Sequence, residues 1–199
     1  MIHEVYLGIV TTLIGVGGTL TAIWFKYYLD RKKNKHNCII DQTIREDGEL
    51  LCKLEDVKSE LSADRISIFS FHNGGEYYAG KSMQKLSCSY EVVMPGVSRT
   101  QLDLQNIPVS ACLTNIRPLI NNKEYHCYDV KRNFPESFCK YKLTESGVKS
   151  VYQFAIFDLN KNAIGIIRAD YITKKVKLTK EVLETLHYLA IKLPGYLTK

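Results

Sequence analysis

The chain of 199 residues begins with a long segment that lacks any charged side chain, from Val5 to Phe25. At about 1.5 Å per residue, a helix over this segment is about 30 Å long, which matches the hydrocarbon core of a bilayer. A core helix of a water-soluble domain rarely stays uncharged over such a length. The absence of charge therefore predicts a membrane-spanning anchor within residues 1–26.

The segment also lacks the features of a cleaved signal peptide, which is the main alternative. No basic region precedes the apolar stretch, where only His3 and Glu4 stand. The stretch is too long, and it ends in aromatic residues instead of a small-residue cleavage site. Four aromatic side chains at this end are typical of a membrane–water boundary: Trp24, Phe25, Tyr27 and Tyr28.

Basic residues are missing before the span and concentrated after it. Five lie between Lys26 and His36, against one acid, Asp30. The positive-inside bias predicts a single-pass protein of the inner (cell) membrane, with Met1–Glu4 outside and the C-terminal part in the cytoplasm. Residues Arg31–Lys35 would meet anionic lipid headgroups.

Residues 37–199 lack a basic stripe, because they carry 22 Lys and Arg against 19 Asp and Glu. This balance gives no reason to expect nucleic acid as a partner. The length suits one domain with a substantial core.

The six cysteines include no C-x-x-C pair, and in a cytoplasmic domain all six are expected to be free thiols. They are Cys38, Cys52, Cys88, Cys112, Cys127 and Cys139. His126 and Cys127 are adjacent, so on a strand they point to opposite faces and cannot share a metal ion. We assign no metal ligands and no catalytic residues.

Two patterns favour self-association. Within the span, small residues recur at steps of three and four, which lets helices approach closely in lipid; they are Gly8, Thr11, Thr12, Gly15, Gly18, Thr19 and Ala22. Residues 27–62 lack proline, and their pattern predicts a basic flank followed by a linker helix. Apolar residues recur along this helix near helical spacing, with an interruption at Asp47 and Gly48. This apolar seam consists of Ile40, Ile44, Leu51, Leu54, Val57 and Leu61. The linker is either a dimerising, signalling helix or one that packs on its own domain.

From residue 63 the pattern changes to strands and turns, and we expect a third part over residues 63–199. Predicted strands cover Arg65–His72, Leu86–Val93, Lys123–Tyr128, Val151–Asp158 and Ala163–Tyr171, with a turn at Asn73–Gly75 and a hairpin loop at Leu159–Asn162. Predicted helices cover Pro108–Ile120, Pro135–Ser146 and a segment capped by Thr179 and ended by Pro194. This order predicts an α+β fold.

Two of these stretches resemble the GAF sensor domain. The segment ESGVKSVYQFAIFDLNKNAIGIIRADY (Glu145–Tyr171) is similar to the late hairpin of that family, and ADRISIFSFHNGG (Ala63–Gly75) is similar to its first strand. The resemblance covers about residues 38–199. The FHNGG…KLSCSYEVV sequence also resembles a subgroup of uncharacterised, membrane-anchored GAF-like proteins of tailed phages and bacteria.

The resemblance implies an antiparallel sheet flanked by helices, with a pocket for a small ligand such as a cyclic nucleotide, tetrapyrrole or amino acid. It also implies pairing through flanking helices. The chain shows no cyclic-nucleotide signature and no chromophore-attachment motif, so the cofactor or ligand stays unidentified.

The residues expected to bind a ligand lie mainly after the first predicted strand. They are His72, Asn73, Gly74, Tyr78, Ser82, Lys85, Glu91 and Arg168. If the first two strands pair as a meander, His72 and Glu91 lie close enough to orient a ligand or exchange a proton. The alternative is a structural hydrogen bond at a strand end. Arg168 shares a strand face with Asp170, which suits either an anion site or a structural ion pair.

These features predict a membrane-tethered, self-associating small-molecule sensor or binding module without enzymatic activity. One alternative is a thiol-dependent GAF-fold enzyme. A related family reduces free methionine sulfoxide with loop cysteines, whereas Cys88 is expected in the middle of a strand. Another alternative is a phage lysis or envelope-modifying membrane protein.

Overall fold

A computed structural model describes residues 2–197, without the side chains of residues 2–16 and 33–38. The chain forms two compact units, Met1–Asp47 and Gly48–Lys199. One helix, α1 (Ile2–Glu60), runs through the boundary between them, with no break at Asp47 or Gly48. The boundary therefore lies inside the predicted linker of residues 27–62.

The first unit is helical. Its described apolar side chains are exposed, Leu20, Ile23 and Phe25 among them, and Trp24 stacks on Tyr28 with ring centroids 5.8 Å apart. Over the part of the chain with described side chains, no helix has an apolar stretch long enough to cross a bilayer. Residues 5–16 of the predicted span, with Gly8, Thr11, Thr12 and Gly15, lie outside that part.

The predicted linker seam divides into two parts. Of the seam residues, Leu54 and Leu61 are buried in the core of the second unit, and Val57 packs against them. Ile40, Ile44 and Leu51 are exposed, so Leu51 does not share the buried face as predicted; its neighbour Leu50 is buried instead. The last turns of α1 therefore pack on their own domain, and a dimerising role for Ile40 and Ile44 stays a prediction.

The second unit is built on one antiparallel sheet of six strands, in the order β3-β2-β1-β6-β5-β4. The strands are β1 (Arg65–Glu76), β2 (Ser82–Val93), β3 (Ile107–Pro108), β4 (Glu124–Cys127), β5 (Ser150–Phe157) and β6 (Ala163–Tyr171). The helices after α1 are η1 (Val109–Cys112, a 3-10 helix), α2 (Leu113–Asn122), α3 (Val130–Asn133), α4 (Phe138–Glu145), α5 (Lys180–Lys192) and α6 (Pro194–Leu197). The α+β class and the antiparallel sheet are confirmed.

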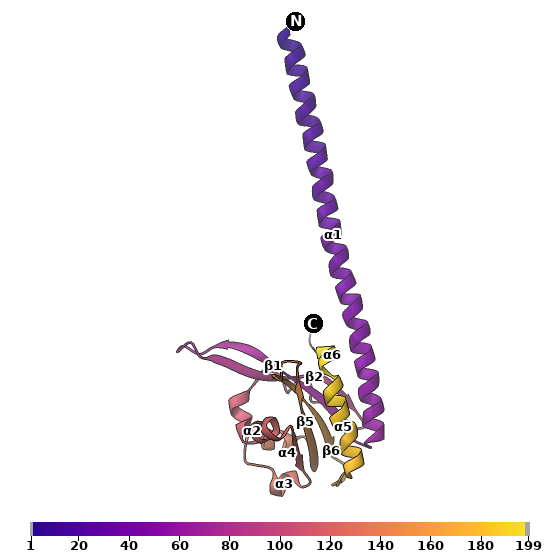
Figure 1. Cartoon of the computed structure of the whole chain (residues 1–199), viewed down its shortest axis with the longest axis vertical. Helices are drawn as coiled ribbons and strands as arrows, with labels where there is room; N and C mark the ends of the chain where they lie inside the picture. Colours follow the sequence, from indigo (N-terminus) through magenta and orange to yellow (C-terminus); the bar gives the residue numbers. More distant parts are fainter. Residues whose placement is uncertain (1, 198–199) are drawn as a thin grey trace. The chain divides into compact units, whose positions relative to one another are not determined.

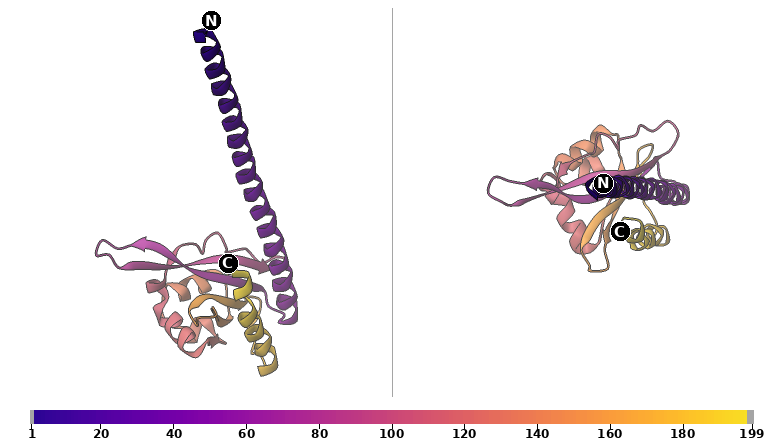
Figure 2. Two further views of the ribbon diagram at one scale, coloured as in Figure 1. Left: turned by 45° about the horizontal axis from the view of Figure 1, so that its top comes forward. Right: turned by 90° about the horizontal axis from the view of Figure 1, so that it is seen from above.

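The two faces of the sheet are covered by different helices (Figures 1 and 2). On one face, which we call the α5 face, Ile66, Ile68 and Ile167 pack against Leu54 of α1 and Leu186 of α5. The opposite face, the α2–α4 face, is covered by α2, α3 and α4. Alternation along each strand separates the two sets of side chains.

Gly165 fixes the spacing between β6 and β1. A Cβ atom at this position would lie 2.5 Å from the backbone oxygen of Phe69, which is too close for any side chain. The glycine in the IGII segment is therefore required by strand packing.

The predicted turn at Asn73–Gly75 is wrong. These residues continue β1 as far as Glu76, with an irregular register against β2 between Asn73 and Glu76, and the chain reverses between Tyr77 and Lys81. Gly75 has φ +102°, which suits glycine at such an irregularity. Residues 72–85 form a hairpin that projects from the rest of the sheet, which we call the arm (Figures 1 and 2).

Candidate functional site

Four charged side chains form a network inside the domain, on the α2–α4 face. Nε of Arg65 donates a hydrogen bond to Oδ2 of Asp170 at 2.8 Å, and Nη2 of Arg168 donates to the same oxygen at 3.0 Å. Glu91 lies 3.8 Å from Arg65. All four side chains are almost fully buried. Because two cations face two anions, the network is balanced, as burial of charge requires.

The cross-strand register explains this gathering. Ser67 pairs with Glu91 on one side and with Arg168 on the other, while Arg65 pairs with Asp170. Alternate residues of three neighbouring strands thus point to one face. For Arg168 and Asp170, the predicted shared face is confirmed, and the pair is a buried ion pair.

Glu91 holds the loop that follows β2. Its carboxylate accepts hydrogen bonds from the backbone N–H of Thr100 at 2.9 Å, from the Thr100 hydroxyl at 2.8 Å and from the N–H of Gln101 at 3.2 Å. Nη1 of Arg65 also donates to the carbonyl of Ser98 at 3.4 Å. The charged network therefore positions the loop of residues 96–104.

A small cavity of about 30 Å³ lies between the sheet and helices α2 and α4. Its lining is mostly apolar but includes three polar residues with little exposure: Asn115 (2%), Gln153 (5%) and Arg168 (8%). Nδ2 of Asn115 donates to Oε1 of Gln153 at 3.0 Å. The guanidinium of Arg168 lies 4.6 Å from the ring centre of Phe69.

Two buried side-chain atoms of the lining, one in Asn115 and one in Arg168, have no hydrogen bond to a described residue. Within the described residues, Oδ1 of Asn115 is buried and has no hydrogen-bond partner. Nε of Arg168 has no aligned hydrogen bond but lies 3.0 Å from Oδ1 of Asp170, so the ion pair compensates its charge. An unpaired buried acceptor costs about 1–3 kcal/mol, which favours a site where another group supplies a donor.

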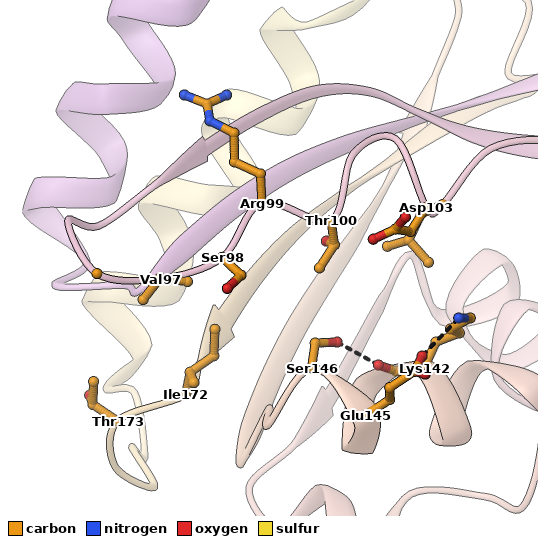
Figure 3. A pocket seen from close by; sticks show the side chains of 12 residues that line it. Val97, Ser98, Arg99, Thr100, Asp103, Lys142, Glu145, Ser146, Ile172 and Thr173 are labelled. Carbon is orange, nitrogen blue, oxygen red and sulfur yellow. Dashed lines mark hydrogen bonds and ion pairs between the residues drawn. The ribbon is translucent and has the colours of Figure 1, made fainter.

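The cavity adjoins a larger open groove of about 750 Å³, since Leu104 and Lys142 line both. The groove lies between the 96–104 loop, the end of α4 and residues Ile172 and Thr173 (Figure 3). Lys142 Nζ contacts Glu145 Oε2 at 2.7 Å across the end of α4. This pair raises the pKa of Lys142 and lowers that of Glu145, so both stay charged at neutral pH. Arg99 points away from the other labelled side chains in this view.

The prediction that all six cysteines are free thiols is wrong. Cys112, at the end of η1, forms a disulfide with Cys139 of α4, which lines the cavity. Cys52, Cys88 and Cys127 are free, and the side chain of Cys38 lies outside the described residues. The sequence did not predict this disulfide, because the pairing depends on how α4 folds back over the start of α2.

The buried thiols are poor nucleophiles. Burial raises the pKa of Cys88 to about 12, despite the nearby positive charge of Arg168. Burial also raises the pKa of Cys127. Cys88 lies within β2, as expected from the sequence, so its position does not suit thiol catalysis.

His126 and Cys127 point to opposite faces, as predicted. The His126 ring contacts Tyr152 and Phe154, whereas Cys127 is buried with Val130 and Val151. Burial lowers the pKa of His126. Among the residues with described side chains, no three His, Cys, Asp or Glu side chains are grouped closely enough to hold a metal ion.

Most of the predicted ligand-binding residues lie on the arm. Asn73 Oδ1 accepts hydrogen bonds from Ser82 Oγ at 3.0 Å and from Gly75 N–H, and the Lys85 side chain lies over Gly74. The side chain of Tyr78 is fully exposed. These residues come together with one another, but they do not line the cavity or the groove.

His72 and Glu91 are not neighbours, so their predicted contact is wrong. His72 pairs with Lys85 and its Nε2 lies 2.8 Å from the Ser87 hydroxyl, whereas Glu91 pairs with Ser67. Five residues of strand separate the two pairs, which is about 17 Å. The sequence showed that the strands pair but not how far the hairpin extends.

The sequence reasoning missed Asn115, Gln153 and Arg65. Gln153 interrupts the apolar run VYQFAIF and Arg65 directly precedes ISIF, so a polar residue within or beside an apolar strand was the available signal for these two. Asn115 lies on helix α2 between Thr114 and Ile116, where no such local signal marks it.

Comparison of the fold finds GAF domains. The GAF domain of PixJ from Thermosynechococcus elongatus, in its blue-light-absorbing form, has a TM-score of 0.60 at 11% identity, covering 78% of this chain and 86% of that one. The phycoerythrobilin-bound GAF domain of a cyanobacterial phytochrome has a TM-score of 0.59 at 17% identity, covering 79% and 87%. A domain of a two-component sensor histidine kinase protein from Sinorhizobium meliloti has a TM-score of 0.52 at 15% identity, covering 74% and 88%.

No family model matches the sequence, and no curated protein sequence matches it significantly. At these identities the structural likeness shows the fold and not the ligand. The chain thus has a GAF-like fold.

Proposed function

We propose that this protein is a small-molecule sensor or binding module without enzymatic activity, and that its ligand enters the groove and reaches the cavity beneath Leu104 and Lys142. The main supporting observation is Oδ1 of Asn115, which has no hydrogen-bond partner among the described residues and lies in a cavity that Gln153 and Arg168 also line. Polar groups with so little exposure are expected to have partners. A few convergent polar groups in an apolar pocket are typical of ligand sites.

The size of the two spaces limits the ligand. A cavity of about 30 Å³ has room for one or two water molecules, whereas the groove of about 750 Å³ matches sites for small organic molecules. We therefore expect a ligand that contacts Asn115 to displace Leu104 or Lys142, which line both spaces. The bilin bound by the phytochrome GAF domain is one candidate class, together with amino acids and cyclic nucleotides.

We also propose that the protein is tethered to the membrane, and this proposal is supported by the sequence. The uncharged Val5–Phe25 segment would cross the inner membrane, with Met1–Glu4 outside and the domain in the cytoplasm. Arg31–Lys35 would contact anionic headgroups. Exposed Ile40 and Ile44 favour a homodimer in which α1 pairs with its copy.

Native mass spectrometry of the full chain, purified in detergent, tests the ligand proposal. We expect a co-purifying molecule that is lost in Asn115→Leu, because leucine has a similar volume and removes both polar atoms. Gln153→Met should weaken binding for the same reason. A matched control is Lys85→Ala on the arm, which should retain the ligand.

The opposite result locates the site elsewhere. If Lys85→Ala and His72→Ala lose the ligand while Asn115→Leu keeps it, the site is on the arm, as the sequence predicted. If the wild-type protein carries no ligand and none of a panel of amino acids, cyclic nucleotides and biliverdin raises its melting temperature, the sensor proposal is wrong.

A further inference from the structure

The Cys112–Cys139 disulfide joins the two helical walls of the cavity. Cys112 ends η1 and directly precedes α2, which carries Asn115 and Ile116. Cys139 lies in the first turn of α4, beside the cavity. The two Cα atoms are 5.6 Å apart, within the usual range for bridged cysteines.

Helix α4 has few other contacts that hold it in place. It has eight residues, and Leu143 is its buried side chain. Its ion pairs, Lys140 with Glu136 and Lys142 with Glu145, join neighbours in sequence and do not tie it to the sheet. Segments with few buried apolar contacts open locally at a low free energy, so a covalent bond has a large influence on this helix.

We propose that Cys112–Cys139 is a redox-responsive site, and that its reduction by a dithiol frees α4 and opens the cavity to ligand. The proposal rests on the proposed function in two respects, namely that the cavity is the ligand site and that the domain faces the cytoplasm. For a domain on the cytoplasmic side, such a bond meets a reducing environment, where disulfides are usually transient or regulatory.

The solvent exposure of the two cysteines determines which sulfur atom the reductant attacks in thiol–disulfide exchange. Cys112 is fully buried, whereas Cys139 is half-buried, so a thiolate of the reductant attacks the sulfur of Cys139. The bond between the two cysteines breaks, and Cys112 leaves as a thiolate and takes up a proton. The second thiol of the reductant then attacks the mixed disulfide and releases Cys139. The protein pair gains two electrons and two protons, and the dithiol becomes a disulfide.

The neighbouring thiols do not compete in this exchange. Cys88 belongs to the same apolar cluster as Cys112, but it is buried and protonated at neutral pH. Cys127 is buried in the cluster against which Cys139 packs, and burial raises its pKa too. Cys52 is exposed on α1 and belongs to neither cluster. An external reductant therefore sets the state of the pair.

Hydrogen–deuterium exchange of the full chain in detergent, with and without dithiothreitol, measures the release of α4. We expect exchange of the Phe138–Glu145 amides to rise at least tenfold on reduction, while amides of β5 and β6 stay protected. Unchanged exchange after reduction, verified by mass, would overturn the proposal. Recovery of both cysteines as free thiols from protein prepared without reductant would overturn it too.

Alkylation by iodoacetamide measures the opening of the apolar cluster in which Cys88 packs with Ile116 and Ile166 of the cavity lining, with Cys52 as an internal control. In the double variant Cys112→Ser/Cys139→Ser we expect Cys88 to react at least tenfold faster relative to Cys52 than in the oxidised wild type. An unchanged ratio in a folded variant would show that the bond does not gate the cavity. If the variant fails to fold, the hydrogen–deuterium exchange of the wild type, with and without dithiothreitol, still tests the proposal. Neither measurement needs a ligand, so these experiments test the redox proposal independently of the sensor proposal.

Discussion

The two faces of the sheet differ in chemistry, although the same strands build both. The α5 face is a continuous apolar core in which Ile66, Ile68 and Phe154 pack against α1 and α5. The α2–α4 face contains a balanced charge network, a disulfide, a cavity and an amide oxygen that no described residue hydrogen-bonds. Apolar packing on one face stabilises the domain and allows the other face to keep polar groups that packing alone would exclude.

The largest effect is expected from breaking the charge network. Asp170→Ala leaves Arg65 and Arg168 buried without their shared carboxylate, and it should lower the free energy of unfolding by about 3–5 kcal/mol. Chemical denaturation measures this loss. Glu136→Ala is the control, because its pairing with Lys140 is at the surface and contributes no more than about 1 kcal/mol. A loss below 1 kcal/mol for Asp170→Ala would mean that the network is not structural.

A cavity on the α5 face should cost stability without affecting ligand binding. Leu54 is fully buried, so Leu54→Ala should lower the free energy of unfolding by about 2–5 kcal/mol. In the folded fraction, native mass spectrometry should find the same ligand occupancy as in the wild type. Loss of ligand from folded Leu54→Ala protein would show that the two faces are coupled.

Alkaline pH should destabilise the domain through Cys88. Its pKa is about 12 in the folded protein against 9.0 for a free thiol, so the folded state keeps its proton longer than the unfolded state. The contribution is complete below pH 9 and is lost as the pH rises towards 12, by up to about 1.4 kcal/mol per pH unit. Denaturation curves of the wild type and Cys88→Ala between pH 8 and 11 measure it. A pH slope equal in both proteins would contradict the assignment.

The smallest effect is expected on the arm. Tyr78 is fully exposed, so Tyr78→Ser should change the free energy of unfolding by no more than about 0.5 kcal/mol. Ligand retention in this variant should equal that of the wild type if the cavity is the site. Loss of the ligand from a stable Tyr78→Ser protein would restore the arm as the binding region.

The sequence by itself determined the fold class and the main strands of the second unit, but not β3, η1 or α3. β-branched and aromatic residues predicted β1, apolar runs predicted β5 and β6, and the Leu159–Asn162 loop predicted the hairpin between β5 and β6, because these signals are local to each segment. Thr179 directly precedes α5 as predicted, although its side chain makes no capping hydrogen bond to the helix.

The tertiary structure decided which residues form the candidate site, and of the three buried polar residues there the sequence had suggested Arg168. Asn115, Gln153 and Arg168 come from α2, β5 and β6, and Cys112 meets Cys139 across 27 residues. Their proximity depends on sheet register and on which helix covers which face, and neither is encoded in a local pattern. The length of the arm, which separated His72 from Glu91, depended on the same pairing. Local preferences fix what each segment becomes, whereas long-range packing decides which side chains meet.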